Sequence, residues 1–123
     1  MDPIGRLAVV VLDCDDPRAL AEFYTSLLGW RADPDDTSDD WVQLVADAGA
    51  TLAFQRVEGY RPPDWPGQDL PQQLHLDVDV PDLDVGERAV LAIGARKHGV
   101  QPSPSNFRVY LDPAGHPFCL CRA

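Results

Sequence analysis

A histidine and two aspartates in the stretch QQLHLDVDVPD, residues 72–82, have the types and spacing that suit chemistry. His75, Asp77 and Asp79 alternate with apolar residues, and this period of two predicts a half-buried strand with these side chains on one face. An imidazole near a carboxylate suits proton transfer near neutral pH or metal binding. Three roles for His75 are open: metal ligand, general acid or base, and a hydrogen-bonded residue without chemistry.

Three cysteines offer thiol chemistry, but their pattern argues against it. No CxxC motif is formed by the three, which are Cys14, Cys119 and Cys121. An odd number of cysteines predicts free thiols in a reducing compartment, and no basic leader precedes a long apolar run, so a cytoplasmic protein is expected. Cys119 has no activating partner near it in the sequence, so an inert buried thiol is expected. His98, in a loop beside a lysine, is expected to be exposed.

Composition limits the classes of partner. The chain has 123 residues, 45% of them hydrophobic, which predicts one folded domain over residues 1–123. A formal net charge of −10 argues against nucleic acid and anionic membranes, because both attract clustered Lys and Arg. The longest apolar run, 7–12, is too short to cross a bilayer. Neutral or cationic small molecules are the expected partners.

The elements that would position these residues occur in the same order twice. In the first half we expect a strand at 6–14, a helix at 15–29, an exposed acidic loop at 32–40 and strands at 41–46 and 51–57. In the second half we expect a strand at 75–80, a helix at 81–96, a loop at 98–106 and strands at 107–113 and 116–122. Between them lies a segment too rich in proline and glycine for a regular element.

The two halves correspond residue by residue at a shift of about 66 residues. Val9 falls on His75, and Trp41 falls on Phe107. So constant a shift indicates an internal repeat. We expect modules at about 5–57 and 73–122, joined by a connector at about 58–72. Each half is too short to cover both faces of its sheet, so the two are expected to share a core and enclose a groove.

The stretches LDCDDPRALAEFYTSLLGW and YLDPAGHPFCL resemble landmarks of the vicinal oxygen chelate superfamily, which has the glyoxalase, bleomycin-resistance and extradiol dioxygenase fold. QLHLDV and DPAGHPFCL most resemble an uncharacterised glyoxalase-like subgroup common in bacteria. The resemblance implies an α+β fold of two βαβββ modules in tandem, with curved sheets around a cavity. It also implies a homodimer, because the family often dimerises across sheet edges.

The resemblance also implies where a metal would bind. In the metalloenzymes of this superfamily, four inward side chains hold one divalent metal, two from each module, and these positions fall on Val9, Gln55, His75 and Cys119. Valine cannot ligate a metal, and glutamine offers only a neutral oxygen. The implied metal site is therefore degenerate, and no cofactor is expected. The alternative is zinc, nickel or iron held by Gln55, His75 and Cys119.

The same resemblance implies a ligand pocket. Its expected residues are Val9, Val11, Asp13, Trp41, Gln55, His75, Asp77, Phe107 and Cys119. Tyr60 and Trp65, on the connector, could cover the groove or only attach the connector to the sheets.

These observations favour a small-molecule-binding protein that resembles the drug-sequestering members of the superfamily. The alternatives are a metal-dependent lyase, isomerase or dioxygenase with the reduced site, metal-free acid–base chemistry at His75, and a module for dimerisation or regulation. The sequence leaves open whether the chain is an enzyme.

Overall fold

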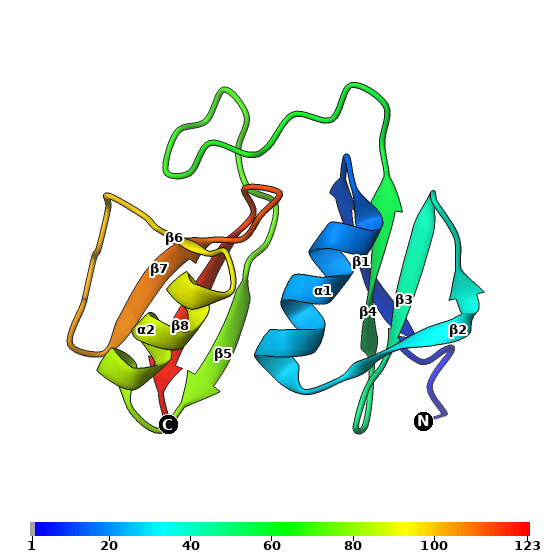
Figure 1. Ribbon diagram of the computed structural model, residues 1–123, viewed down its shortest axis with the longest axis horizontal. Helices are drawn as coiled ribbons and strands as arrows, with labels where there is room; N and C mark the ends of the chain where they lie inside the picture. The colour runs from blue at the N-terminus through cyan, green and yellow to red at the C-terminus, as the bar shows by residue number, and fades with distance from the viewer. Residues whose placement is uncertain (1) are drawn as a thin grey trace. The chain divides into compact units, whose positions relative to one another are not determined.

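The computed structural model describes residues 2–123, which divide into two compact units on either side of the bond between Tyr60 and Arg61 (Figure 1). We call them the first and the second module. Among residues 2–123, neither helix combines the length and the apolar character that crossing a membrane requires.

The first module is a four-stranded sheet with one helix. Its elements are β1 (Val9–Cys14), α1 (Pro17–Leu28), β2 (Arg31–Thr37), β3 (Trp41–Val45) and β4 (Thr51–Arg56). The strand order is β1-β4-β3-β2, with β1 parallel to β4 and the other pairs antiparallel. Helix α1 contacts β2, β3 and β4 (Figure 1).

Local sequence explains the bounds of α1. The carboxylate of Asp16 accepts a hydrogen bond from the N–H of Ala19 at 3.2 Å, and Pro17 opens the first turn, as a capped helix start requires. Gly29 ends the helix with a φ of 71°, a conformation that favours glycine. The apolar face of the helix is buried, and Tyr24 stacks on Phe54 of β4 with ring centroids 5.3 Å apart.

The sequence predicted a loop at residues 32–40, and this prediction is wrong because most of the segment forms β2. Arg31 and Ala32 pair with Val45 and Leu44 of β3, and the register then shifts before Thr37. Pro34 is tolerated because β2 is the edge strand of its sheet and an edge position need not donate to a neighbour. The acidic residues of this segment are mostly exposed, as expected.

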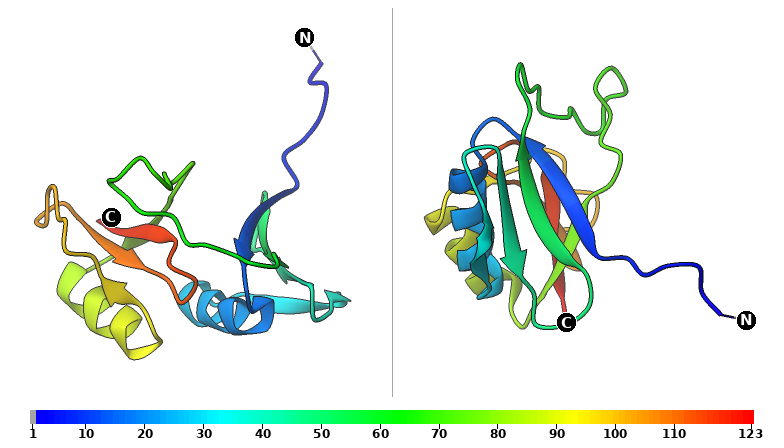
Figure 2. Two further views of the ribbon diagram at one scale, coloured as in Figure 1. Left: turned by 90° about the horizontal axis from the view of Figure 1, so that it is seen from above. Right: turned by 90° about the vertical axis from the view of Figure 1, so that its right-hand side faces the viewer.

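The second module repeats the first. Its elements are β5 (Leu76–Val80), α2 (Leu83–Ala92), β6 (Arg96–Lys97), β7 (Phe107–Leu111) and β8 (Pro117–Arg122). The strand order β5-β8-β7-β6 and the pairing directions match those of the first sheet, and in each module the helix follows the first strand (Figure 2). The expected α+β fold of two tandem βαβββ modules is confirmed. The short β6 is an element that the sequence did not predict.

A glycine inside α2 allows the helix to approach its sheet. A Cβ on Gly86 would lie 3.2 Å from Leu120 of β8 and 3.3 Å from Val80 of β5. These distances are shorter than ordinary carbon–carbon contacts. Gly86 has a low helix propensity, but its lack of a side chain permits α2 to pack closely on the two strands.

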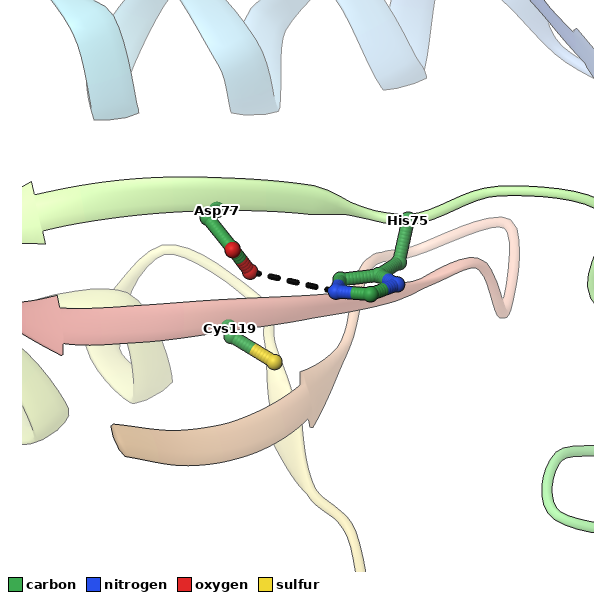
Figure 3. Close-up of side chains that lie close together, drawn as sticks. All are labelled: His75, Asp77 and Cys119. Carbon is green, nitrogen blue, oxygen red and sulfur yellow. Dashed lines mark ion pairs between the residues drawn. The ribbon is translucent and has the colours of Figure 1, made fainter. Parts of the chain in front are cut away.

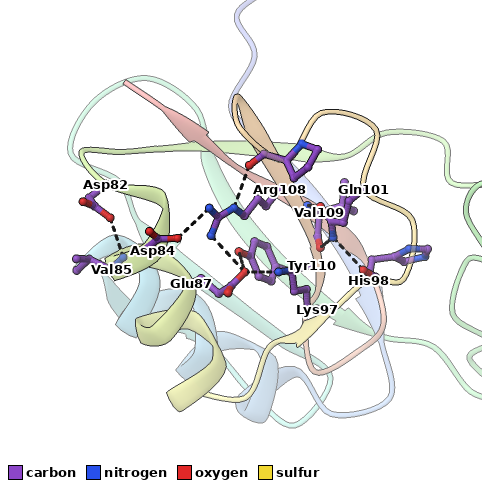
Figure 4. Close-up of polar contacts among 11 residues, drawn as sticks. Asp82, Asp84, Val85, Glu87, Lys97, His98, Gln101, Arg108, Val109 and Tyr110 are labelled. Atoms are coloured by element: carbon purple, nitrogen blue, oxygen red, sulfur yellow. Dashed lines mark hydrogen bonds and ion pairs between the residues drawn. The ribbon is translucent and has the colours of Figure 1, made fainter.

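A polar network also fastens α2 to β6 and β7 (Figure 4). The carboxylate of Glu87 lies 2.9 Å from Lys97 Nζ and accepts a hydrogen bond from the hydroxyl of Tyr110 at 2.9 Å. Arg108 lies 3.5 Å from Glu87 and 2.9 Å from Asp84. The hydrogen bond with Lys97 lowers the pKa of Glu87, and burial and the bond to Glu87 raise the pKa of Tyr110.

Candidate binding site

A cavity of about 200 Å³ lies in the second module. Most of its wall is apolar. It is lined by Trp65, Gln72, His75, Pro102, Phe107, Val109, Pro117 and Cys119. Three of the nine residues expected in a ligand pocket, His75, Phe107 and Cys119, therefore meet at one cavity.

Strand register explains why these residues meet. Asp77 of β5 lies opposite Cys119 of β8, and Cys119 lies opposite Val109 of β7. Directly opposed residues of neighbouring strands point to the same side of a sheet. His75 precedes β5 by one residue and is two residues from Asp77, so the alternation of the strand directs it to the same side.

His75, Asp77 and Cys119 form a compact polar group beside the cavity (Figure 3). His75 Nε2 lies 3.2 Å from Asp77 Oδ1. One donor atom from each of the three residues lies within 4.8 Å of the others. Cys119 is buried, whereas His75 and Asp77 are exposed. Imidazole, carboxylate and thiolate are donors that suit a divalent metal such as zinc.

The thiols of this face are held in their protonated form. Burial and the negative charge of Asp77 raise the pKa of Cys119 to about 12. Burial and the charges of Asp77 and Asp79 also raise the pKa of Cys121. Because the thiolate is the reactive species, neither cysteine is suited to be a nucleophile at neutral pH. This agrees with the expectation of an inert thiol at Cys119.

Trp65 of the connector forms part of the cavity wall and is held there by His98. His98 Nε2 lies 2.9 Å from the carbonyl oxygen of Trp65, and the two rings are in edge contact at 5.1 Å. The Nδ1 atom accepts a hydrogen bond from the N–H of Val100 at 2.9 Å. Since Nδ1 accepts, Nε2 carries the hydrogen that the carbonyl of Trp65 receives.

The expectation that His98 is exposed is wrong, since its side chain is half-buried in these contacts. Its partner lies 33 residues away, and no local pattern marked the pair. The sequence marked Trp65 as a connector residue that could cover the groove or only attach the connector to the sheets, but it gave no sign of the contact with His98.

The other pocket residues expected from the sequence belong to the first module. Asp13 of β1 and Trp41 of β3 both lie opposite Gln55 of β4, so these three share one face of the first sheet. Alternation along β1 places Val9 and Val11 on the same face as Asp13. Gln55 and Asp13 are exposed, and Trp41 is half-buried.

A larger hollow of about 480 Å³ lies in the first module, and its lining includes Arg18, Trp30, Arg31 and Thr37. None of the nine expected pocket residues lines it. Size alone does not identify a site, so the smaller cavity, which joins an apolar wall to convergent polar groups, is the candidate.

Comparison with known proteins agrees with this architecture. Residues 9–121 match the model of a family described as "Glyoxalase-like domain". Among curated proteins, no sequence matches the chain significantly.

Solved structures show the same fold. A glyoxalase/bleomycin resistance protein/dioxygenase family enzyme from Burkholderia phytofirmans is 17% identical, with a TM-score of 0.73 over 96% of this chain and 98% of that one. A glyoxalase-related enzyme from Fulvimarina pelagi is 19% identical, with a TM-score of 0.67 over 98% and 89%. The bleomycin-binding protein of Streptomyces verticillus, solved with copper(II)-bleomycin, is 21% identical, with a TM-score of 0.59 over 100% and 99%.

The family match covers nearly the whole chain, and the two sheets have the strand order of the βαβββ repeat. The chain therefore belongs to the glyoxalase-like domain family, within the vicinal oxygen chelate superfamily.

Proposed function

We propose that this protein binds a small, flat, largely apolar molecule in the cavity of the second module. The observation that carries the proposal is the make-up of the cavity wall. Trp65, Phe107 and Val109 supply apolar surface, while His75 and Gln72 supply polar groups. Ligand pockets in general combine an apolar wall with a few polar groups that orient the ligand.

The size and charge of the site narrow the class of ligand. A cavity of about 200 Å³ is smaller than most drug-binding pockets, so a molecule of one or two rings fits it best. The exposed carboxylates of Asp77 and Asp79 lie on the same sheet face, and the net charge of the chain is −10. A ligand with a positive charge next to an aromatic ring suits both the carboxylates and the indole of Trp65.

A protein that sequesters a drug binds it without changing it chemically. One structural relative is a bleomycin-binding protein, which supports the proposal by analogy of fold. We further propose that the two modules act as one domain of a cytoplasmic homodimer.

Acid–base chemistry at His75 is a second candidate function, favoured by its 3.2 Å contact with Asp77. A carboxylate next to an imidazole orients the ring, as in many enzymes that use histidine as a base. A metal-dependent lyase, isomerase or dioxygenase reaction at Gln55, His75 and Cys119 is its variant. Either one requires turnover of a substrate, which the binding proposal does not.

Calorimetric titration with three probes of one shape tests the binding proposal. Benzamidine, benzamide and benzoate are flat single rings with positive, zero and negative charge. We expect benzamidine to bind with a Kd below about 1 mM, equivalent to about 4 kcal/mol, and several-fold more tightly than benzoate. Trp65→Ala should weaken benzamidine binding about tenfold because it removes an aromatic wall.

The matched control is Trp30→Ala, since Trp30 is a half-buried tryptophan outside the cavity. It should leave benzamidine binding unchanged. Absence of binding by all three probes, or equal weakening by both tryptophan variants, would contradict the proposal.

A further inference from the structure

Three side chains with metal-binding chemistry come together on two neighbouring strands of the second sheet. Asp77 of β5 is directly opposite Cys119 of β8, and His75 stands two residues before Asp77. All three lie in one module, so the register of a single parallel strand pair brings them together. Neither strand has to move for their donor atoms to lie within 4.8 Å of one another.

The spacing of the donor atoms is close to that of a zinc site. Zinc bonds of about 2.0–2.3 Å with tetrahedral angles place neighbouring donors about 3.3–3.6 Å apart. His75 Nε2 and Asp77 Oδ1, at 3.2 Å, already have this spacing. The Sγ atom of Cys119 lies no more than 4.8 Å from the other donors, so it must approach by up to about 1.2 Å to complete the set. Small side-chain rotations of Cys119 and Asp77 can supply this movement.

Asp77 is the centre of the group. A carboxylate oxygen of Asp77 lies 3.2 Å from Nε2 of His75 and within 4.8 Å of the Sγ atom of Cys119. A carboxylate that already faces an imidazole and a thiol is oriented as a metal ligand must be. Half of the side chain of Asp77 is open to solvent, at 58% exposure, so a cation can reach it.

We propose that His75, Asp77 and Cys119 form a three-ligand site for a thiophilic divalent cation such as zinc, contained within the second module. The site differs from the four-ligand arrangement that the family resemblance implies. It uses Asp77, which is outside that set, and needs neither Val9 nor Gln55. Three protein ligands are the usual number where zinc keeps one position open, and the cavity is lined by two of the three.

The inference goes beyond the proposed binding function and does not depend on it. Benzamidine binding can be measured in protein treated with a chelator, and metal binding can be measured without benzamidine. Failure of one is therefore distinguishable from failure of the other.

Titration of the metal-free full-length chain with cobalt(II) tests the site. We expect one cobalt per chain, the intense visible absorption of a tetrahedral ion and a thiolate-to-cobalt charge-transfer band in the near ultraviolet. Zinc should displace the cobalt and remove both features. Cys119→Ser should remove the charge-transfer band, and Asp77→Ala should weaken cobalt binding at least tenfold, since even loss of a group that only orients a ligand costs that much.

Two matched variants separate this site from its alternatives. Asp79→Ala removes a neighbouring carboxylate of the same strand face, and Gln55→Ala removes the first-module ligand expected from the resemblance. Both should bind cobalt like the natural chain. Circular dichroism checks that each variant is folded, and Asp77→Asn provides a second test at an exposed position that the fold does not need.

Three results would overturn the inference. The first is no cobalt binding, and the second is binding without a charge-transfer band. The third is equal loss of affinity in Gln55→Ala and Asp77→Ala, which would show that the metal is shared with the first module.

Discussion

His75 shows how the neighbours of one residue decide what its side chain can do. Its imidazole lies 3.2 Å from Asp77 and at the wall of a largely apolar cavity. The same position supports three roles: orienting a bound ring, moving a proton, and holding a metal with Asp77 and Cys119. The protonated thiol of Cys119 argues against a fourth, in which the cysteine attacks a substrate.

Gln72, also in the cavity wall, supports a prediction at this scale. Its side-chain oxygen is buried and has no hydrogen-bond donor among residues 2–123, which destabilises the folded state. Gln72→Leu should therefore raise the free energy of unfolding by about 1 kcal/mol, measured by urea denaturation. Gln73→Leu, at the exposed neighbouring position, should change it by less than about 0.5 kcal/mol. Equal effects of the two substitutions would contradict this account.

At the scale of elements, α2 depends on polar contacts as well as on apolar packing. Its buried apolar residues include only Leu83 and Val90, whereas α1 buries five residues of its length. The contacts of Glu87 with Lys97, Arg108 and Tyr110 join the helix to two strands. Attachment of α2 should therefore depend on pH more strongly than attachment of α1.

The pH dependence follows from the charge of Glu87. Its pKa is lowered from the ordinary value of 4.5, so the folded state favours the carboxylate. This contribution is complete above the unfolded pKa of 4.5 and is lost as the pH falls through the lower folded pKa. Glu87→Gln should lower the free energy of unfolding by about 1–2 kcal/mol near neutral pH. This loss of stability should become smaller as the pH falls through the folded pKa of Glu87.

Urea denaturation of the natural chain and the variant at several pH values measures this difference. Asp84→Asn is the control, because the side chain of Asp84 is 74% exposed and Arg108 is its single ion-pair partner within residues 2–123. Its cost should stay below about 0.5 kcal/mol. A cost of Glu87→Gln that is the same at all pH values would rule out the electrostatic explanation.

At the scale of the whole molecule, the repeat leaves strands at the edges of both sheets. β1 and β5 each end the strand order of their sheet. Edge strands offer unpaired backbone groups that favour pairing with another chain. We predict a homodimer, which light scattering after size-exclusion chromatography would detect as about twice the 13.5 kDa of one chain. A mass of one chain at all protein concentrations would contradict this prediction.

The amino-acid sequence by itself determined the repeat and most of the elements. Alternation marked β5, and Pro17 and Gly29 marked both ends of α1, because strand periodicity and helix ends are local properties. The constant shift between the halves also predicted a structural repeat, and the two sheets have the same strand order.

Only the tertiary structure decided the rest. The strand β2 depends on pairing with β3 rather than on its own acidic, proline-containing sequence. The placement of Trp65 depends on His98, and the meeting of His75, Asp77 and Cys119 depends on the register of β5 with β8. Each of these joins residues that are distant along the chain, and such contacts are set by packing and backbone pairing rather than by local preference.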